Sequence, residues 1–170
     1  MTIHSDHPFA DPAAERDPAR RFRGRLGGAV TLWTAASGRG RAGLTVSSVM
    51  VAGGEPSRLL ALLDPDSDLA ETLTSTGRGV VHLLQWADRD LAEMFAGTAP
   101  APGGTFAQAE FLDTDWGPRL ASVATWAEVS VEDTREVGWS TLVTAVVDAV
   151  TVGDGDDPLV HRRGRFVPPA

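Results

Sequence analysis

Short runs of apolar and β-branched residues, separated by turn-forming residues, occupy most of the chain after residue 27. Residues 28–36 (GAVTLWTAA) and 42–52 (AGLTVSSVMVA) are rich in β-branched side chains and lack helical spacing, which is typical of strands. The remaining strands are predicted over residues 58–64, 80–86, 121–137, 139–152 and 158–166.

Helical spacing of apolar residues occurs in three places. The predicted helices cover residues 13–26, 87–97 and the second part of 65–79. In the first helix, Phe22 and Leu26 lie one turn apart, and we expect them to share a buried face. In the helix that ends near residue 79, Leu69 and Leu73 are expected to face inward together.

The order of these elements predicts the fold class. Six or seven strands, joined mostly by short loops and accompanied by three short helices, indicate a mainly β, antiparallel barrel rather than a βαβ stack. Residues 1–12 are polar and Pro-rich and are expected to form a disordered or extended tail. Residues 13–170 are expected to form a single domain, since this length is sufficient for one core.

Composition excludes several function classes. The chain has 170 residues and a formal net charge of −8, and all 15 of its basic residues are arginines. An acidic domain is a poor candidate for contact with a nucleic-acid backbone or an anionic membrane. The absence of cysteine excludes disulfides, thiolate catalysis and cysteine-ligated zinc. No apolar signal segment is present and no stretch approaches the roughly 20 apolar residues of a membrane span, so a cytoplasmic protein is expected.

The chain also offers little to a metal ion or a hydrolase mechanism. His4 and His7 lie in the predicted tail, and no histidine or carboxylate set has ligand spacing, so no metal site is expected. The acidic segment 153–158 (GDGDDP) lacks the full calcium-loop pattern and is expected to be a solvated hairpin turn. No G-x-S-x-G nucleophile elbow occurs.

Three glycines, Gly38, Gly40 and Gly43, match the G-x-G-x-x-G pattern of dinucleotide-binding loops. In a Rossmann fold that pattern requires a helix to begin inside it, because the helix N-terminus holds the pyrophosphate. Here the following residues, 44–51 (LTVSSVMV), have the composition of a strand. We therefore expect these glycines to form a hairpin turn.

Hydroxyl side chains cluster within this otherwise apolar strand, at Thr45, Ser47 and Ser48. Two interpretations are open. The strand is half-exposed with its polar face in water, or its hydroxyl and backbone groups line a polar ligand.

At this point the chain resembles the flavin reductase family with an FMN-binding split barrel, the small reductase components of two-component flavin monooxygenases. The resemblance runs from about Phe22 to Phe166. The segments that carry it are RFRGRLGGAVTLWTA, GLTVSSVMV, LLALLDPDSDLAETL, GVVHLLQWADRDLAEMFAG and HRRGRF. It implies a split β-barrel with a few short helices, in which HRRGRF closes the barrel.

The resemblance also implies an activity. Members of the family are NAD(P)H:flavin oxidoreductases, which transfer a hydride from NADH or NADPH to FMN or FAD and supply reduced flavin to a partner oxygenase. They form homodimers that complete their flavin sites at the subunit interface. Alternatives are a flavin-binding carrier, sensor or accessory protein without reductase activity and, more remotely, an oxidoreductase that uses a deazaflavin-like cofactor.

By the same resemblance, the strand containing Thr45, Val46, Ser47 and Ser48 runs along the isoalloxazine ring and ribityl chain. A flat amphipathic ring needs an apolar wall and a few fixed donors and acceptors. Ser67, in the turn DPDSD, corresponds to the region that approaches the flavin phosphate. The alternative interpretation of Ser67 is a plain helix cap.

The closing segment HRRGRF corresponds to a region where the family places a histidine near the flavin and the nicotinamide. His161 is therefore the candidate catalytic residue, with a charged surface turn as the alternative. Arg165, together with Arg162 and Arg163, would bind phosphate or merely offset the acidic surface. Three arginines within four positions are a local exception in a chain of net charge −8.

Two departures from the family pattern bear on the site. His82 stands where the family often has asparagine; it either replaces that asparagine beside the flavin or is a hydrogen-bonded core residue. Gly138, Trp139 and Ser140 stand where the family often has Gly-Asp-His near the nicotinamide. This replacement favours the flavin-binding alternative, and Trp139 would either stack on a ring or cap the end of the barrel.

Overall fold

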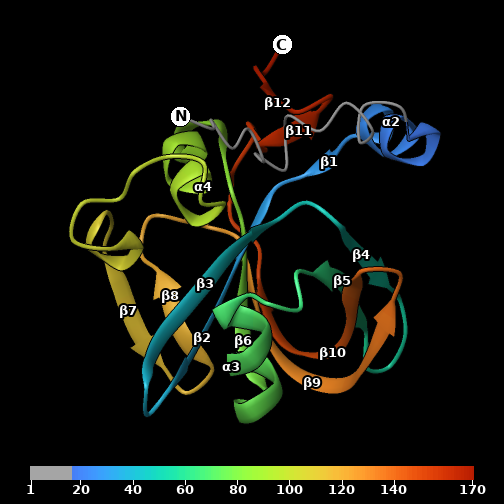
Figure 1. Ribbon diagram of the computed structural model, residues 1–170. Coiled ribbons are helices and arrows are strands. Elements are labelled where there is room, and N and C mark those ends of the chain that lie inside the picture. The colour runs from blue at the N-terminus through green and yellow to red at the C-terminus, as the bar shows by residue number, and fades with distance from the viewer. Residues whose placement is uncertain (1–16) are drawn as a thin grey trace, which may run out of the picture.

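The computed structural model describes residues 17–170 and is built on one large antiparallel sheet (Figure 1). Its seven strands have the order β3-β2-β6-β9-β10-β5-β4. Their bounds are Gly40–Val46 (β3), Thr31–Ser37 (β2), Arg78–Leu83 (β6), Trp126–Val137 (β9), Ser140–Thr151 (β10), Arg58–Leu63 (β5) and Val49–Ala52 (β4). The predicted mainly β class is confirmed, since strands make up most of the regular structure. The predicted antiparallel arrangement is confirmed as well, because every pairing in this sheet is antiparallel.

The sheet curls until its two edge strands meet. β3 and β4 lie at opposite edges of the sheet but follow one another in the chain, separated only by Ser47 and Ser48. The N–H of Leu62 in β5 donates to the carbonyl oxygen of Ser48 at 3.1 Å. The single strand predicted over residues 42–52 is therefore two strands, and the junction between them closes the barrel.

Two small sheets flank the barrel. β1 (Gly28–Ala29), β11 (Val160–Arg162) and β12 (Arg165–Val167) form one, and β7 (Phe111–Thr114) pairs with β8 (Gly117–Leu120) in the other. The prediction that HRRGRF closes the barrel is wrong, because β11 and β12 pair with β1 outside the large sheet. The β7–β8 hairpin was not predicted.

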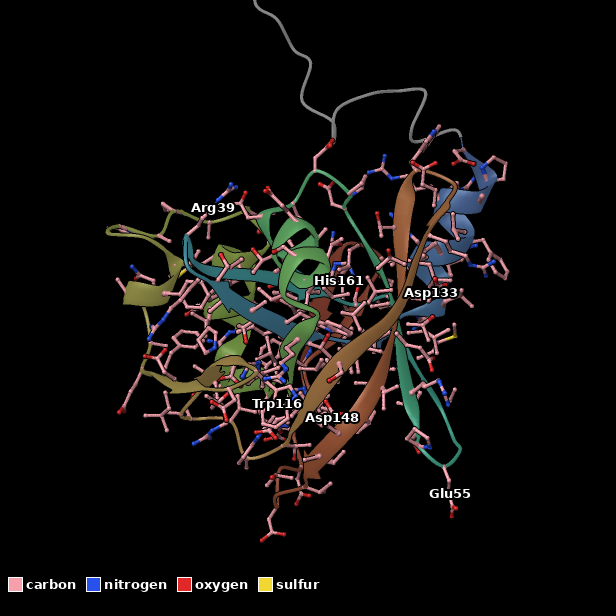
Figure 2. The ribbon with its side chains drawn as sticks, turned by 90° about the horizontal axis from the view of Figure 1, so that it is seen from below. Arg39, Glu55, Trp116, Asp133, Asp148 and His161 are labelled. Atoms are coloured by element: carbon pink, nitrogen blue, oxygen red, sulfur yellow. The ribbon has the colours of Figure 1, made fainter. Side chains whose placement is uncertain are left out.

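Several side-chain contacts fasten the flanking hairpin β7–β8 to the barrel, and one of them is made at its turn. Trp116, at its turn, donates from Nε1 to Oδ2 of Asp148 in β10 at 2.9 Å, and Figure 2 shows the two residues side by side.

The segment 153–158, expected to be a hairpin turn, instead carries the chain from β10 to β11 in a different sheet.

Helix α3 (Asp68–Thr76) lies against the curled sheet and contacts β2, β3 and β9. Leu69 and Leu73 are fully buried, as predicted. They pack in a core that includes Trp33, Leu63, Val129 and Val143. Burying side chains of this size contributes about 1.5–3 kcal/mol each, so α3 is a main support of the barrel.

A second core lies under helix α4 (Arg89–Phe95), on the side of β1 and β8. Its fully buried members include Leu32, Leu84, Leu120 and Leu159. Two 3₁₀ turns, η1 (Trp86–Asp88) and η2 (Thr105–Ala107), flank this core. Phe95, Phe106 and Phe111 meet edge-on, with ring centroids 4.8–6.0 Å apart.

Helix α2 spans Pro18–Leu26, and Asp17 caps it by accepting from the N–H of Ala19 at 2.9 Å. The predicted start at residue 13 lies outside the described residues. The prediction that Phe22 and Leu26 share a buried face is wrong, because they are 66% and 69% exposed. The helix buries no residue. It contacts β11, which lies beside it (Figure 1).

The glycine pattern forms a hairpin, as predicted. Ser37 pairs with Gly40 across a turn at residues 38–39, and Gly43 pairs with Thr34 within the β2–β3 ladder. A Cβ on Gly43 would lie 2.6 Å from a ring carbon of Phe95. The third glycine of the pattern therefore makes room for an aromatic side chain, and no helix begins there.

Candidate functional site

The Ser47–Ser48 junction, which we define as these two residues between β3 and β4, exposes polar backbone at the point of barrel closure. Both residues are exposed. The Ser48 hydroxyl donates to the carbonyl oxygen of Leu62 at 2.8 Å. Within residues 17–170, three donors of the junction have no acceptor in the protein. They are the backbone N–H groups of Ser47 and Ser48 and the hydroxyl of Ser47. The junction thus offers a row of hydrogen-bond donors at the surface.

The two preceding residues of the predicted flavin strand face the interior instead. The Thr45 hydroxyl donates to the carbonyl oxygen of Ala92 in α4 at 2.6 Å. Val46 is buried, and its carbonyl oxygen accepts from the Thr31 hydroxyl at 2.7 Å. These contacts fix the end of β3, so Thr45 and Val46 position the junction.

Gly28 connects this junction to the C-terminal hairpin. It pairs with His161 in the β1–β11 ladder. A Cβ on Gly28 would lie 2.8 Å from the carbonyl oxygen of Ser47, closer than such atoms approach in proteins. The absence of a side chain at Gly28 therefore lets the junction pass directly over β1. Sequence reasoning missed this residue, although the pair Gly27-Gly28, where the first predicted strand begins, is its signal.

His161 is half-buried, and its ring meets that of Phe166 edge-on at a centroid distance of 5.8 Å. The pKa of His161 is lowered from 6.5, first by burial and second by the positive charge of Arg23. Both effects favour the neutral imidazole at neutral pH. The structure thus brings the candidate histidine to the same side of β1 as an arginine-bearing helix.

Arg165 lies beyond His161 at the end of the hairpin, where it pairs with Arg162. Both are exposed, and Arg163 between them has a left-handed φ of 53°. The predicted cluster of arginines therefore faces solvent.

Ser67 caps helix α3. Its hydroxyl accepts from the N–H of Ala70 at 3.2 Å and donates to the carbonyl oxygen of Asp64 at 2.7 Å. Exposed carboxylates of Asp64, Asp66 and Asp68 surround it. The cap interpretation fits this geometry, and the local charge opposes an anion.

His82 lies in the barrel wall with no exposed surface. Its Nδ1 lies 2.8 Å from the carbonyl oxygen of Leu32, and its Nε2 lies 2.9 Å from the backbone nitrogen of Leu120. Nδ1 therefore carries the proton and donates, and Nε2 accepts. No ring nitrogen is left for a ligand, so the structure favours a hydrogen-bonded core histidine.

Trp139 occupies the β9–β10 turn and is 97% exposed. It does not cap the barrel. Gly138 before it has a left-handed φ of 57°, which suits the tight turn. Leu142, three residues further on, pairs with Leu62, whose carbonyl oxygen accepts from the Ser48 hydroxyl. The turn therefore lies at the junction end of β10.

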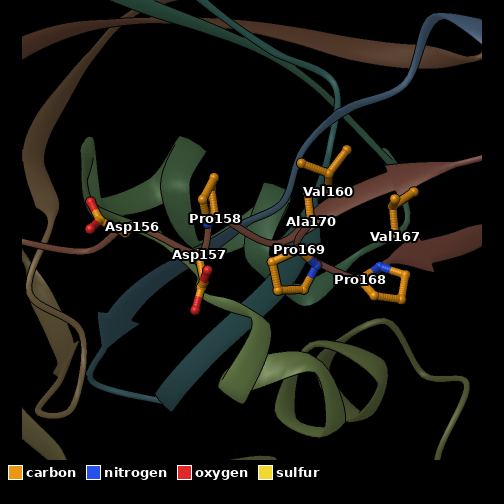
Figure 3. Close-up of a pocket in the computed structure, with 8 residues that line it drawn as sticks. All are labelled: Asp156, Asp157, Pro158, Val160, Val167, Pro168, Pro169 and Ala170. Carbon is orange, nitrogen blue, oxygen red and sulfur yellow. The ribbon is translucent and has the colours of Figure 1, made fainter.

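Two hollows on the surface of residues 17–170 lie away from the junction. One of about 380 Å³ is formed by the C-terminal segment (Figure 3). Its lining residues are Asp156, Asp157, Pro158, Val160, Val167, Pro168, Pro169 and Ala170. A second, of about 250 Å³, lies between α4 and residues 108–122. Neither includes a predicted site residue, and Ser47 and Ser48 of the junction are exposed.

Two properties of residues 17–170 complete the description of the site. In this part of the chain, no helix is long and apolar enough to cross a bilayer. No group of three or more His, Cys, Asp or Glu side chains that could hold a metal ion occurs among the same residues.

The fold is an antiparallel, curled sheet whose two edges are joined by the exposed Ser47–Ser48 junction. Residues 23–170 match the flavin reductase like domain, and the chain belongs to that family. A relative, the FMN reductase (NADH) RutF of Ancylobacter novellus, is 30% identical over 156 residues, covering 91% of this chain and 86% of that protein. The NADH:FMN oxidoreductase of Rhodococcus erythropolis is 29% identical over 144 residues, covering 82% and 74%.

Solved structures share the fold. The NADH:FAD oxidoreductase SgcE6 of Streptomyces globisporus, in complex with NAD and FAD fragments, superposes with a TM-score of 0.82 at 22% identity, covering 94% of this chain and 95% of that one. The styrene monooxygenase flavin reductase of Pseudomonas putida S12 gives 0.80 at 23% identity, covering 91% and 98%. The predicted split-barrel fold is thereby confirmed.

Proposed function

We propose that the chain is an NADH:flavin oxidoreductase that reduces FMN or FAD and supplies the reduced flavin to a partner oxygenase. The observation that carries the proposal is the exposed Ser47–Ser48 junction at the point where the barrel closes. The family match over residues 23–170 and the relatives' names support it. We place the protein in the cytoplasm, where NADH is available.

The residues at the junction fit a flavin. The pyrimidine edge of the ring system needs fixed donors and acceptors, and the benzenoid part needs an apolar wall. The two N–H groups and the Ser47 hydroxyl supply the donors. Met50 and Leu62, which are 67% and 39% exposed beside the junction, supply apolar surface. This donor set and its apolar border match an amphipathic ring better than a metal ion or a sugar phosphate.

When bound, the flavin would accept a hydride equivalent from the nicotinamide. The contribution of the chain is to hold two rings in contact, roughly 3–3.5 Å apart, and to exclude water. We assign His161 to contact these rings from the β11 side, where its lowered pKa keeps the imidazole neutral. A neutral ring can approach the flavin without adding charge, and hydride transfer itself needs no acid or base from the protein.

For the phosphate, the sequence predicts Ser67 and Arg165. The surroundings favour Arg165, because Ser67 uses its hydroxyl in the α3 cap among three carboxylates. Thr45 and Val46 are assigned to positioning, since their polar atoms bond within the fold.

We further propose that two copies of the chain form a homodimer that encloses the junction. The outer face of the neighbouring strands is apolar, with Met50 in β4, Leu60 and Leu62 in β5 and Leu142 in β10. Leu60 pairs with Met50, and Leu142 pairs with Leu62. A second copy on this face would cover apolar surface and turn the open junction into a closed site.

The alternative is a flavin-binding protein without reductase activity. The exposed Trp139 turn favours it, because Trp139 and Ser140 replace the Asp and His that the family often carries there. Such a protein would bind flavin at the same junction and leave NADH unoxidised.

One experiment separates these functions. The purified full chain is mixed with FMN or FAD, and flavin binding is followed by fluorescence quenching. NADH consumption is then measured with and without flavin. Binding together with flavin-dependent NADH consumption supports the reductase. Binding without consumption supports the alternative, and absence of binding overturns both.

A further inference from the structure

Positive charge is concentrated on two adjacent elements of this acidic protein. The arginine surface, as we define it, comprises Arg20, Arg21, Arg23 and Arg25 of α2 and Arg162, Arg163 and Arg165 of the β11–β12 hairpin. These are seven of the 15 basic residues, and no Asp or Glu occurs in residues 18–27 or 160–167. The chain has a net charge of −8, which would be −15 without these seven.

Two segments that are far apart in sequence are held together to make this surface. The N–H of Arg163 donates to the carbonyl oxygen of Gly24 at 2.8 Å. At Gly27 a Cβ would lie 3.7 Å from Cβ of Arg162, so the end of α2 packs closely on the hairpin. Figure 1 shows α2 beside β11. Six of the seven arginines are exposed, and Arg20 is half-buried.

These arginines lack carboxylate partners within residues 17–170. The ion pairs of that part of the chain involve other arginines, at positions 39, 41, 58 and 89. Like charges gathered without counter-charges repel one another, although solvent and salt screen the repulsion. The helix dipole accounts for Arg23 and Arg25 in the last turn of α2 but not for the hairpin arginines. A bound anion would supply counter-charge to the arginines near it.

The arginine surface adjoins the Ser47–Ser48 junction. Gly28 follows α2 directly, pairs with His161 and approaches the carbonyl oxygen of Ser47. Arg23 is close enough to His161 to lower its pKa. On the other side of the junction, the chain leads through Leu62 to the acidic turn around Ser67. One side of the junction therefore attracts anions and the other repels them.

We propose that the arginine surface binds the phosphate of a nucleotide whose ring lies on the Ser47–Ser48 junction. The inference rests on the proposed function. Guanidinium groups bind phosphate through paired, charge-assisted hydrogen bonds, and they stay charged at any physiological pH. FMN, FAD and NADH all carry phosphate, so the chemistry is shared and the flavin and the hydride donor are its two sources.

Phosphate-free analogues distinguish these sources. Riboflavin is FMN without its phosphate, and an N-alkyl dihydronicotinamide is a hydride donor without phosphates. The test variant is Arg23→Gln with Arg165→Gln, which takes one arginine from each segment. Glutamine keeps the helix propensity of α2. The matched control is Arg39→Gln, an exposed arginine in the β2–β3 turn whose ion pair with Glu71 is solvent-exposed and therefore contributes little.

Equilibrium binding of FMN and riboflavin, and KM for NADH and its phosphate-free analogue, are measured for each protein. The double variant is expected to bind the phosphate-bearing ligand about tenfold to hundredfold more weakly than wild type. This factor corresponds to the loss of hydrogen bonds to charged groups. The phosphate-free partner should be unaffected, and the control should behave like wild type. Loss for FMN alone assigns the surface to the flavin, and loss for NADH alone assigns it to the hydride donor.

Two results would overturn the inference. One is unchanged affinity for every ligand in the double variant. The other is an equal loss for ligands with and without phosphate, which would mean that the arginines only support the fold. Flavin binding can be measured without turnover, so a wild-type chain that binds FMN but consumes no NADH defeats the reductase proposal and leaves this test intact.

Discussion

The ring of His82 bridges two backbone segments that belong to different elements: Nδ1–H donates to the carbonyl oxygen of Leu32 in β2, and Nε2 accepts from the N–H of Leu120 in β8. The contact fastens the flanking β7–β8 hairpin to the barrel wall. It also requires a neutral ring, because an imidazolium has no acceptor for Leu120. Burial is the main reason that the pKa of His82 is lowered from 6.5 to about 4.

The lowered pKa predicts a loss of stability in acid. Between pH 6.5 and about 4, the unfolded chain protonates His82 and the folded chain does not. The free energy of unfolding therefore falls as pH falls, by about 1.4 kcal/mol per pH unit and about 3 kcal/mol in all. His82→Gln removes this titration and costs about 1–3 kcal/mol near neutrality through lost hydrogen bonds.

Urea unfolding of wild type and His82→Gln at about pH 7.5 and about pH 5 checks this. The difference in the free energy of unfolding between the two proteins is expected to shift by about 2 kcal/mol against wild type at the lower pH. His161→Gln serves as the control, since that ring is only half-buried and its removal should change the pH dependence less. A gap that stays constant between the two pH values would contradict the assignment.

Gly28→Ala is expected to damage the flavin site selectively. The new Cβ would lie 2.8 Å from the carbonyl oxygen of Ser47 and would push the junction away from β1. Overpacking of this kind costs typically about 1–3 kcal/mol, which corresponds to about a tenfold or greater loss of flavin affinity if the junction absorbs it. Flavin titration by fluorescence measures the change.

The matched control is Gly38→Ala in the β2–β3 turn, where a Cβ meets no atom within 4 Å. Its flavin affinity should equal that of wild type. Equal affinities for Gly28→Ala and wild type would show that the ring does not lie on the junction.

The local pattern of residue types was sufficient to predict where strands occur, but not where the sheet closes into a barrel. Residues 28–36 and 58–64 carry their alternation or apolar runs within themselves. Residues 58–63 and 31–36 form strands of the large sheet, whereas Gly28–Ala29, predicted as part of the same strand, is β1 of the three-stranded sheet. The break at the Ser47–Ser48 junction could not be predicted in the same way. It occurs where the chain crosses between sheet edges, and the curl of all seven strands determines that position.

The site shows the same division between local and non-local information. Phe22 and Leu26 have the spacing of a buried face, yet both are exposed, because within residues 17–170 the contact of α2 with β11 does not cover these side chains. His161 was predicted because HRRGRF resembles the closing segment of the family. Its neighbour Gly28 was not predicted, because their contact joins segments more than a hundred residues apart.

Gly43→Ala tests the glycine pattern. The added Cβ would lie 2.6 Å from a ring carbon of buried Phe95, so the fold should lose about 1–3 kcal/mol of stability through overpacking. KM for NADH should stay near the wild-type value, because this glycine supports packing and approaches no pyrophosphate. Thermal unfolding and steady-state kinetics measure the two effects. A large rise in KM with unchanged stability would favour a nucleotide-binding loop instead.

The proposed dimer predicts that charge on the outer sheet face separates the subunits. Met50→Glu with Leu62→Glu would place carboxylates on an apolar surface that a second copy covers, where unpaired charge is costly. Light scattering should then report a monomer, and flavin affinity should fall at least tenfold because the site stays open and its apolar border is charged. Val152→Glu, at a residue that is 78% exposed just beyond the far end of β10, is the control and should leave both unchanged. A double variant that remains dimeric would place the interface elsewhere, and a monomer that binds flavin as tightly as wild type would show that one chain is sufficient for the site.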